Sequence, residues 1–320
     1  MRNLLVLAAL VVIVLAGGVS SRVAAQGRTS GPKQRIESSA IALRIVKDEP
    51  YRTDAAKTDF HKVDFYAPIA KPTRPAPAYP MVVFFHGGAW IAGDKESPFE
   101  RLPEFARSLA EAGIVVAMAN YRLAPQFKAA MIVDDCARAV AHAASRAEDF
   151  GADPTRIFLA GHSAGAHLAA LLATNPKPLQ TAGFDAALLR GVVCLSGVYH
   201  FNGLAGWAGR PFLAHGDKTA VSPLAHVRKG LPPFLVLSAE NDLPGLRRHA
   251  ERLRNALVAA EVPVDHREVK KLDHVQIMLA AGFPRSEVAT AIRFFVQTGR
   301  LESPEVPPQP LRPTTRRTRI

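Results

Sequence analysis

The stretch Ile157-Phe158-Leu159-Ala160-Gly161-His162-Ser163-Ala164-Gly165 decides the fold. Its first four residues predict a buried strand, and its last residues predict a helix that begins near Ala164. A strand that turns directly into a helix strains the backbone of the central residue and presents its side chain at the apex. The small residues Gly161 and Gly165 let the strand and the helix pass closely. The stretch therefore favours a nucleophilic Ser163 over a merely tight turn.

Segments typical of strands alternate with segments of helical spacing along the middle of the chain. Strands are predicted at residues 58–66, 81–85, 114–119, 157–160, 192–195, 234–237 and 264–270, and helices at 99–112, 132–146, 164–174, 246–260 and 287–296. This alternation indicates a mostly parallel sheet that is covered by helices on both faces. We predict one α/β domain over residues 26–302, with its chemistry at the carboxyl ends of the strands.

A serine hydroxyl needs a base to take its proton and an acid to orient that base. Of the 11 histidines, His274 follows the last predicted strand at its carboxyl end, which makes it the predicted base. Asp242 stands just past the strand at 234–237 and is the predicted acid. The chain order Ser163, Asp242, His274 is the order expected for this type of sheet.

Other histidines and acids are placed less well for these two roles. His266 lies within a strand, and His142 and His249 lie on helices, so we expect these three to face solvent. His162 and His167 stand beside the serine, and we expect them to point along a different face. Glu240 stands too close to a strand, and Asp217 lies in an irregular stretch. Asp273 adjoins His274, and the side chain of a direct neighbour usually points away.

A second glycine-containing stretch, His86-Gly87-Gly88-Ala89-Trp90, follows the strand predicted at 81–85. Consecutive glycines after a strand leave backbone N–H groups uncovered, so that they can converge on a developing negative charge. We predict an oxyanion site made by the N–H groups of Gly87, Gly88 and Ala164, with each donor lowering the barrier by on the order of 3 kcal/mol. A plain glycine turn would explain this stretch by itself, but it explains the two stretches together much less well.

Three segments carry a resemblance to a known family: HGGAWIAGDK at 86–95, NYRLAP at 120–125 and AGHSAGAHL at 160–168. Together they resemble the α/β-hydrolase esterases of the group that contains hormone-sensitive-lipase-like carboxylesterases, bacterial feruloyl-esterase-like enzymes and kynurenine formamidases. The resemblance covers about residues 60–296 and implies an α/β-hydrolase fold. It also implies the triad Ser163, Asp242 and His274, the oxyanion donors Gly87, Gly88 and Ala164, and a histidine that holds the glycine loop, His86.

Two positions depart from the usual pattern of this family. The third glycine expected after the histidine is Ala89 here, which should leave two usable amides in that loop. The proline often found soon after the Tyr-Arg-Leu motif is replaced around Ala129-Ala130, which we expect to be only a loop change. Trp90 and the irregular stretch 199–207 either line the substrate pocket or pack as ordinary aromatic residues, and the sequence does not choose between these roles.

The motifs predict hydrolysis of a small-molecule carboxylic ester through an acyl-enzyme intermediate, with no cofactor and no metal. Ser163 would attack the carbonyl, His274 would take its proton, and Asp242 would stabilise the charged imidazole. Formamidases and other amidases share these motifs, although export argues against them because their usual tryptophan-derived substrate is intracellular. A binding protein on a catalytically dead hydrolase scaffold is the third alternative, but such proteins usually lose the serine or the histidine. The acyl chain, the alcohol and the oligomeric state do not follow from the sequence.

The two ends of the chain are expected to lie outside the fold. Residues 1–25 have a positive start, an uncharged apolar run over 4–16 and small residues before Gln26, which is typical of a secretory signal peptide cut after Ala25. The apolar run is shorter than the roughly 20 residues of a spanning helix, which disfavours an uncleaved anchor and membrane insertion of the mature protein. We therefore expect export, to the periplasm or the medium, and a flexible proline- and arginine-rich tail at 303–320.

The composition excludes several classes of protein. With 48% hydrophobic and 21% charged residues among 320, the chain is neither disordered nor fibrous. Two cysteines, Cys136 and Cys194, exclude a disulfide-rich scaffold and a cysteine-based zinc site, and we expect them to be unpaired core residues. The net charge of +12 comes without a basic stripe or a nucleic-acid motif, so no nucleic-acid partner is expected. The basic tail is the expected site of weak contact with acidic envelope polymers.

Overall fold

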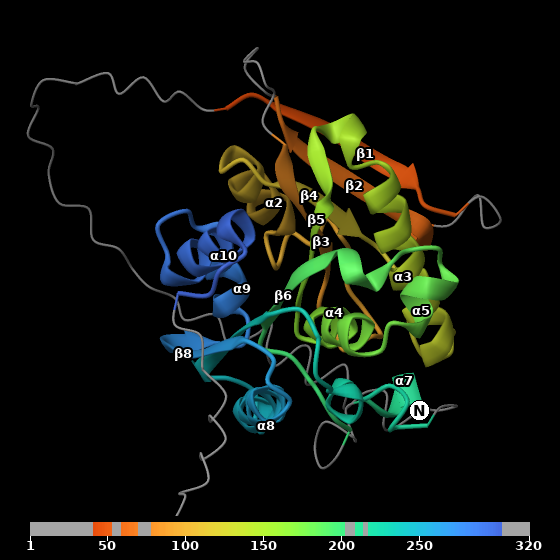
Figure 1. Ribbon diagram of the computed structural model, residues 1–320, viewed down its shortest axis with the longest axis vertical. Coiled ribbons are helices and arrows are strands. Elements are labelled where there is room, and N and C mark those ends of the chain that lie inside the picture. The colour runs from red at the N-terminus through yellow and green to blue at the C-terminus, as the bar shows by residue number, and fades with distance from the viewer. Residues whose placement is uncertain (1–40, 53–58, 70–77, 202–208, 214–216, 303–320) are drawn as a thin grey trace, which may run out of the picture. The chain divides into compact units, whose positions relative to one another are not determined.

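An eight-stranded sheet runs through the described part of the chain (Figure 1). The computed structural model describes residues 41–52, 59–69, 78–201, 209–213 and 217–302. The strands are β1 (Leu43–Pro50), β2 (Lys62–Pro68), β3 (Tyr79–Phe85), β4 (Val115–Ala119), β5 (Ala152–His162), β6 (Leu189–Leu195), β7 (Phe234–Asn241) and β8 (Val264–Asp273). They are arranged in the order β1-β2-β4-β3-β5-β6-β7-β8. The pairs β1–β2 and β2–β4 are antiparallel, and the other neighbouring pairs are parallel.

Each face of the sheet carries its own apolar core, because successive side chains of a strand point to opposite faces. In β3, Val82 and Phe84 belong to one core, whereas Met81, Val83 and Phe85 belong to the other. All of these side chains are fully buried. Burial on both faces explains why the central strands are continuous apolar runs rather than alternating ones.

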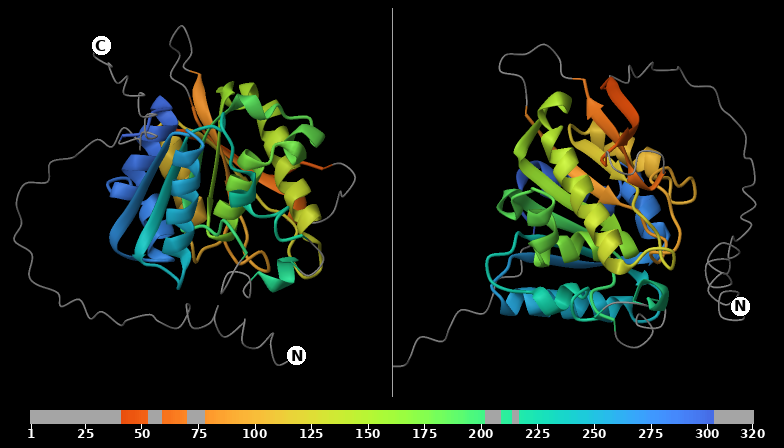
Figure 2. Two further views of the ribbon diagram at one scale, coloured as in Figure 1. Left: turned by 60° about the horizontal axis from the view of Figure 1, so that its bottom comes forward. Right: turned by 90° about the vertical axis from the view of Figure 1, so that its right-hand side faces the viewer.

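Helices cover both faces of the sheet (Figure 2, left). Those described are α2 (Leu102–Glu111), α3 (Ala129–Ser145), α4 (Ala164–Thr174), α5 (Lys177–Thr181), α7 (Arg210–Leu213), α8 (Leu246–Ala259), α9 (Gln276–Gly282) and α10 (Glu287–Thr298). Apolar residues of α3, α4 and α8 pack into the core on one face, and those of α2, α9 and α10 pack into the core on the other. The predicted mostly parallel sheet with helices on both faces is confirmed.

The N-terminal side of the sheet differs from the prediction. The sequence does not predict β1, because its residues are mostly half-buried or exposed and show neither a continuous apolar run nor a clear alternation. The strand predicted near the sheet edge, at residues 58–66, corresponds to β2. It is second from the edge, because β1 pairs with its outer side. β2 also begins only at Lys62, because Asp59–His61 form a short 3-10 helix.

The predicted and observed bounds of a helix agree at both ends for α4 but differ at the start of α2. α4 spans the predicted residues. The helix predicted from residue 99 begins only at Leu102, with Pro103 in its first turn, where a missing N–H costs no intrahelical bond. The short helices α5, α7 and α9 have 5, 4 and 7 residues, too few for helical spacing to be recognised. Cys136 and Cys194 are buried and free, as expected.

Several predictions fall outside the described residues. They concern the signal peptide at 1–25, the tail at 303–320 and the part of the irregular stretch 199–207 that begins at residue 202. The described residues from Ile41 to Glu302 belong to one compact unit. In this part of the chain, no helix has both the length and the apolar character that crossing a membrane requires.

Candidate active site

The turn between β5 and α4 holds Ser163 in a strained conformation. Its backbone has φ 53° and ψ −114°, a region that residues with a side chain rarely adopt. A Cβ at Gly161 would lie 2.3 Å from the carbonyl carbon of Gly165, and a Cβ at Gly165 would lie 2.0 Å from the carbonyl oxygen of Phe85. Neither position has room for a side chain, so the predicted close passage of strand and helix is confirmed.

Ser163, His274 and Asp242 form one line of hydrogen bonds, although they follow three different strands, β5, β8 and β7. Nε2 of His274 lies 3.0 Å from Oγ of Ser163, and Nδ1 of His274 lies 2.7 Å from Oδ1 of Asp242. An ionised carboxylate only accepts, so Nδ1 carries the ring proton and Nε2 is left to accept the serine hydroxyl. The structure thus brings the three predicted residues together at the carboxyl ends of their strands.

The side chain of Asp242 is fully buried and accepts hydrogen bonds on both oxygens. Ser196 donates to Oδ2 at 2.5 Å, and the backbone N–H of Leu243 donates to Oδ1 at 2.8 Å. Burial alone would raise the pKa of this carboxyl group, but the bonds from His274 and Ser196 outweigh burial and lower the pKa below its ordinary value. Asp242 is therefore ionised at neutral pH, and its negative charge favours the protonated form of His274.

Burial governs the protonation of His274. It lowers the pKa of this imidazole below its ordinary value of 6.5, and the positive charge of nearby His162 acts in the same direction. The bond to Asp242 opposes both effects without overcoming them. His274 is consequently neutral at pH 7, which is the state that a general base needs.

The competing acids and histidines have other partners. In the described part of the chain, three acids accept backbone N–H groups away from His274: Glu240 from Lys271, Asp217 from Thr219, and Asp273 from Val275 and Gln276. The expectation that three histidines face solvent is wrong for His249, which is 4% exposed, whereas His142 and His266 are half-buried and keep part of their surface in solvent. On α8, His249 falls on the core-facing stripe of Leu246, Ala250, Leu253 and Leu257, so helical spacing indicates its burial.

The loop after β3 combines a left-handed backbone with free N–H groups. Gly88 has φ +112°, and a Cβ there would lie 2.0 Å from the carbonyl oxygen of Ala92. Ala89 and Trp90 also have positive φ values, of 52° and 63°, so an alanine adopts a left-handed conformation at the expected third glycine. Among the described residues, the N–H groups of Gly88 and Ala164 find no acceptor within the chain. The oxyanion role of the predicted donors stays a prediction.

His86 contacts this loop, as the resemblance implies. Its Nδ1–H donates to the carbonyl of Gly87 at 2.7 Å, and its ring stacks on that of Tyr121 with 4.2 Å between the ring centres. The Tyr121 hydroxyl in turn donates to the carbonyl of His86 at 2.7 Å. Tyr121 belongs to the second resembling segment, 120–125, so one role of that segment is to fix the first.

Polar side chains tie the end of the glycine loop to the sheet. Asn120 accepts the N–H of Lys95 at 2.6 Å and donates to Asp94 at 2.7 Å. The side chain of Lys95 is 3% exposed, and its ammonium lies 2.9 Å from the buried carboxylate of Asp64 on β2. A buried charge that loses its partner costs about 3–5 kcal/mol, so this ion pair fixes the position of the loop.

Trp90 packs among aromatic side chains near the serine. Its indole N–H donates to Nδ1 of His167 at 3.1 Å, and its ring lies 5.0 Å from that of Phe212 and 5.5 Å from that of Phe201. The Nε2–H of His167 donates to the carbonyl of Val221 at 2.7 Å, and burial lowers the pKa of His167 to about 4. Because Trp90 is 2% exposed, it acts as a packing residue among the described side chains.

His162 is hydrogen-bonded to Glu100 and to the loop that carries His274, the predicted base. Its Nδ1 lies 2.6 Å from Oε1 of Glu100, and its Nε2 lies 2.8 Å from the carbonyl oxygen of His274. The sequence gives no sign of these contacts, because Glu100 is 62 residues away and belongs to no motif.

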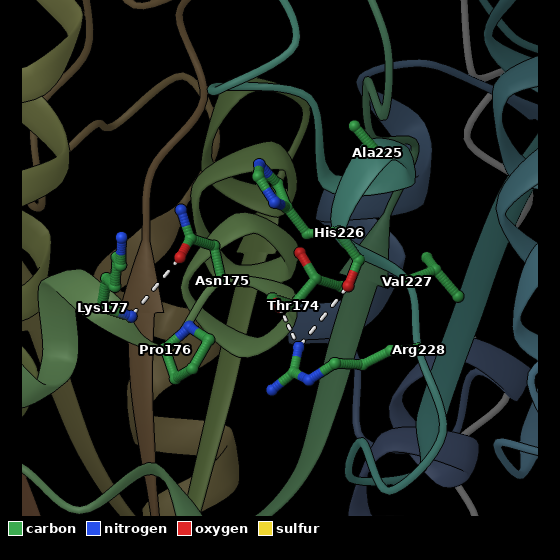
Figure 3. A pocket seen from close by; sticks show the side chains of 8 residues that line it. All are labelled: Thr174, Asn175, Pro176, Lys177, Ala225, His226, Val227 and Arg228. Carbon is green, nitrogen blue, oxygen red and sulfur yellow. Dashed lines mark hydrogen bonds between the residues drawn. The ribbon is translucent and has the colours of Figure 1, made fainter.

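A shallow groove lies at the far end of α4 (Figure 3). It is lined by Thr174, Asn175, Pro176, Lys177, Ala225, His226, Val227 and Arg228. Arg228 donates to the carbonyl oxygens of Thr174 and His226 (Figure 3). At about 1.5 Å per residue over the 11 residues of α4, the groove lies about 16 Å along the helix from Ser163 and is separate from the serine site. In the described part of the chain, no cluster of three or more histidine, cysteine, aspartate or glutamate side chains could hold a metal ion.

Known proteins share both the sequence pattern and the fold. Residues 82–278 match the family model described as alpha/beta hydrolase fold. Kynurenine formamidase of Danio rerio is 26% identical over 263 residues, which are 79% of this chain and 82% of that protein. The probable carboxylic ester hydrolase LipM of Mycobacterium tuberculosis is 28% identical over 247 residues, which are 69% of this chain but 57% of LipM. Among solved structures, a truncated carbohydrate esterase from gut microbiota has a TM-score of 0.67 at 18% identity, covering 84% of this chain and 99% of that one.

The matched segment spans more than half of the 320 residues and contains the glycine loop, Ser163, Asp242 and His274. The solved structure shares the fold, and the sequences of the two curated relatives align with more than two thirds of this chain. The chain therefore belongs to the α/β-hydrolase fold family, within the esterase group that its three segments resemble.

Proposed function

We propose that the protein hydrolyses carboxylic esters, with Ser163 as nucleophile, His274 as general base and Asp242 as the acid that orients the base. The observation that carries the proposal is the line of hydrogen bonds through these residues, with distances of 3.0 and 2.7 Å. The strained turn at Ser163 and the neutral state of His274 support it, because a serine nucleophile needs both exposure and a free base. The esterase relatives support the choice of an ester as substrate.

The reaction would proceed in two steps that return the site to its starting state. Oγ of Ser163 attacks the carbonyl carbon while its proton moves to Nε2 of His274. The N–H groups of Gly87, Gly88 and Ala164 hold the negative charge that develops on the carbonyl oxygen. The charged imidazole then gives its proton to the leaving alkoxide oxygen as the C–O bond breaks. A water molecule then attacks the acyl carbon while its proton moves to His274, and the charged imidazole returns the proton to Oγ of Ser163 as the Oγ–acyl bond breaks and the carboxylic acid leaves.

A fluorophosphonate probe tests the nucleophile directly, because it phosphonylates an activated serine. We expect the wild type to be labelled and Ser163→Ala to stay unlabelled. Ser145→Ala is the matched control, because Ser145 is exposed at the end of α3, and it should be labelled like the wild type. An unlabelled wild type, or equal labelling of Ser163→Ala, would reject the proposal and favour a binding protein on a hydrolase scaffold.

A formamidase is the second candidate, because a kynurenine formamidase is 26% identical over 79% of this chain. Both reactions pass through an acyl-serine and differ in the leaving group, which is an alcohol or an amine. A panel of p-nitrophenyl esters of rising acyl length, beside an aryl formamide, separates the two. We expect kcat/KM to be higher for at least one ester than for the formamide, and the opposite order would favour the formamidase.

We also propose that the chain is exported and that residues 1–25 are removed. The support comes from the positive start, the apolar run and the small residues that precede Gln26. N-terminal sequencing of the protein from separated cell fractions tests this, and we expect chains that begin at Gln26 in the periplasm or the medium. Full-length chains that stay inside the cell would contradict the proposal.

The basic segment 303–320 is proposed to hold the exported protein near acidic envelope polymers through its four arginines. We expect deletion of this segment to lower envelope association and to shift elution from a cation exchanger to lower salt. Unchanged association and unchanged elution would refute the proposal.

A further inference from the structure

A second buried acid–histidine pair lies beside the triad. Nδ1 of His162 lies 2.6 Å from Oε1 of Glu100, and the two residues are 3% and 8% exposed. Nε2 of His162 lies 2.8 Å from the carbonyl oxygen of His274, so the pair contacts the backbone of the base itself. The ester hydrolysis proposed above gives neither residue a role.

The hydrogen-bond pattern determines how many protons the pair holds. A carbonyl oxygen only accepts, so Nε2 of His162 carries a proton. The bond at Nδ1 needs a second proton, which lies on the ring when Glu100 is ionised. Burial opposes both charges, but the mutual contact outweighs it, so the pKa of His162 is raised and the pKa of Glu100 is lowered. The pair therefore consists of an imidazolium and a carboxylate.

The carbonyl that His162 binds belongs to the loop that carries the base. His274 stands between the end of β8 at Asp273 and the start of α9 at Gln276. The carboxylate of Asp273 accepts the N–H groups of Val275 and Gln276 at 3.0 and 2.8 Å, which ties the loop to itself. His162 supplies the bond that ties the same loop to the end of β5, one residue before the serine.

The pair also lies against the glycine loop. A Cβ at Gly87 would lie 2.8 Å from Oε1 of Glu100 and 3.0 Å from Nδ1 of His162, so the backbone of Gly87 packs directly on the two polar side chains. The ring of His162 lies 4.8 Å from the ring of His274. The pair thus stands between the loop that carries the base and the loop that is predicted to hold the oxyanion.

We propose that Glu100 and His162 form a positioning pair, which holds His274 through its backbone carbonyl and keeps Nε2 of His274 in line with Oγ of the serine. The inference rests on the proposed ester hydrolysis and adds two residues to it, neither of which is expected to touch the substrate. A displacement of a reacting group by about 1 Å can lower a rate by about 100-fold. Loss of the anchor should therefore lower kcat far more than it changes KM.

Three variants separate the hydrogen bonds of the pair from its charges. His162→Phe keeps an aromatic ring but donates nothing to His274, and Glu100→Ala leaves His162 without its acid. Glu100→Gln keeps both hydrogen bonds, because the amide can donate to Nδ1 of a neutral His162 while Nε2–H still binds the carbonyl of His274. It removes both charges. Glu104→Gln is the matched control, because the side chain of Glu104 is 51% exposed on α2.

With a p-nitrophenyl ester, we expect kcat to fall about tenfold or more in His162→Phe and Glu100→Ala, with KM within about threefold of the wild type. Glu100→Gln should keep kcat within about threefold. The charged and titratable groups that face His274 are His162, Asp242 and Glu100, and His162 affects its pKa more than Glu100 does. Without the charged pair, the acid limb of kcat/KM should therefore move to higher pH in Glu100→Gln.

A purely structural role of the pair predicts a different result. Wild-type kcat and an unmoved acid limb in the variants would overturn the positioning pair, and so would activity lost only in proportion to the folded fraction measured by circular dichroism. Glu100→Gln keeps the test valid where another variant does not fold, because its acid limb is measured on active protein. A wild type that neither hydrolyses esters nor reacts with the fluorophosphonate refutes the proposed function, whereas an active wild type with indifferent variants refutes only the pair.

Discussion

Besides His274, Asp242 has donors of two kinds. Leu243 and Ala239 donate through their backbone N–H groups, at 2.8 and 3.3 Å, and Ser196 donates through its hydroxyl at 2.5 Å. A backbone donor cannot be removed by an ordinary substitution, but the hydroxyl can. Ser196 is therefore the residue through which the surroundings of the acid can be tested while the proposed triad stays intact.

Ser196→Ala removes one hydrogen bond to a charged carboxylate. Such a bond contributes about 1.5–3 kcal/mol, and its loss should raise the pKa of Asp242 toward the ordinary value. We expect kcat for a p-nitrophenyl ester to fall by about tenfold, because the carboxylate then holds His274 less firmly. Ser238→Ala is the matched control, since its hydroxyl on β7 lies near His266 instead. Equal kcat in the two variants would contradict this role of Ser196.

With His274 as the proposed general base, its pKa should set how the rate depends on pH. Protonation of Nε2 removes the base, so kcat/KM falls as the pH falls through this pKa. Burial and the charge of His162 lower the pKa below 6.5, so we expect half-maximal kcat/KM below pH 6.5 and a plateau at neutral pH. A pH profile with an ester that does not ionise measures the midpoint. A midpoint above pH 6.5 would mean that the attraction of Asp242 outweighs burial.

At the scale of elements, the close passage of α4 over the sheet explains why Gly165 is needed. Gly165→Ala would place a Cβ 2.0 Å from the carbonyl oxygen of Phe85, which is strand backbone that cannot move aside. Overpacking of this kind costs about 1–3 kcal/mol and occasionally more. We expect the free energy of unfolding to fall by about 3 kcal/mol, with loss of ester hydrolysis because the start of α4 carries Ser163.

Gly282→Ala is the matched control for this prediction. Gly282 ends α9, and a Cβ there would make only ordinary contacts, at 3.6 Å from the backbone of Phe105. Urea unfolding of the two variants measures the difference in the free energy of unfolding. Equal stability of the two would show that strand and helix separate at little cost.

Local patterns predict the elements that carry the site. A strand buried on both faces is a continuous apolar run, so β3 is recognised from 81–85 and begins only two residues earlier, at Tyr79. The position just past a parallel strand is where functional side chains gather, so the same reasoning places Asp242 and His274. β1 is not predicted, because a half-buried edge strand has no comparable pattern.

Contacts between distant parts of the chain cannot be predicted in this way. Ser196 lies 46 residues from Asp242, and Glu100 lies 62 residues from His162. The contact of Ser196 depends on β6 lying between β5 and β7, because the chain after β6 then reaches the residue after β7. The order of strands does not follow from any one segment, so these partners become visible only in the folded protein.

At the scale of the whole molecule, two buried histidines must be neutral for the fold to keep its hydrogen bonds. His167 accepts the indole N–H of Trp90 on Nδ1, and His249 accepts the backbone N–H of Tyr199 on Nδ1, both at 3.1 Å. A proton on either atom would remove the bond. Burial lowers the pKa of His167 to about 4 and that of His249 to about 3, whereas an unfolded histidine titrates near 6.5.

This difference predicts that the fold loses stability in mild acid. Between pH 6.5 and about 4 the unfolded chain binds more protons at these histidines than the folded chain, so the free energy of unfolding falls as the pH falls. At pH 5, each of the two should lower it by about 2 kcal/mol, at about 1.4 kcal/mol for each pH unit below 6.5. The raised pKa of His162 acts in the opposite direction, but it is one histidine against these two, whose pKa values are lowered to about 4 and about 3.

Urea unfolding at pH 7.5 and at pH 5 measures this loss, and His249→Asn isolates one part of it. The amide oxygen of asparagine can accept the N–H of Tyr199 and does not titrate, so the variant should lose about 2 kcal/mol less than the wild type between the two pH values. His226→Asn, at the groove of Figure 3, is the matched control and should lose as much as the wild type. If His249→Asn instead loses as much stability as the wild type, the fold does not hold His249 neutral, and the acid sensitivity has another origin.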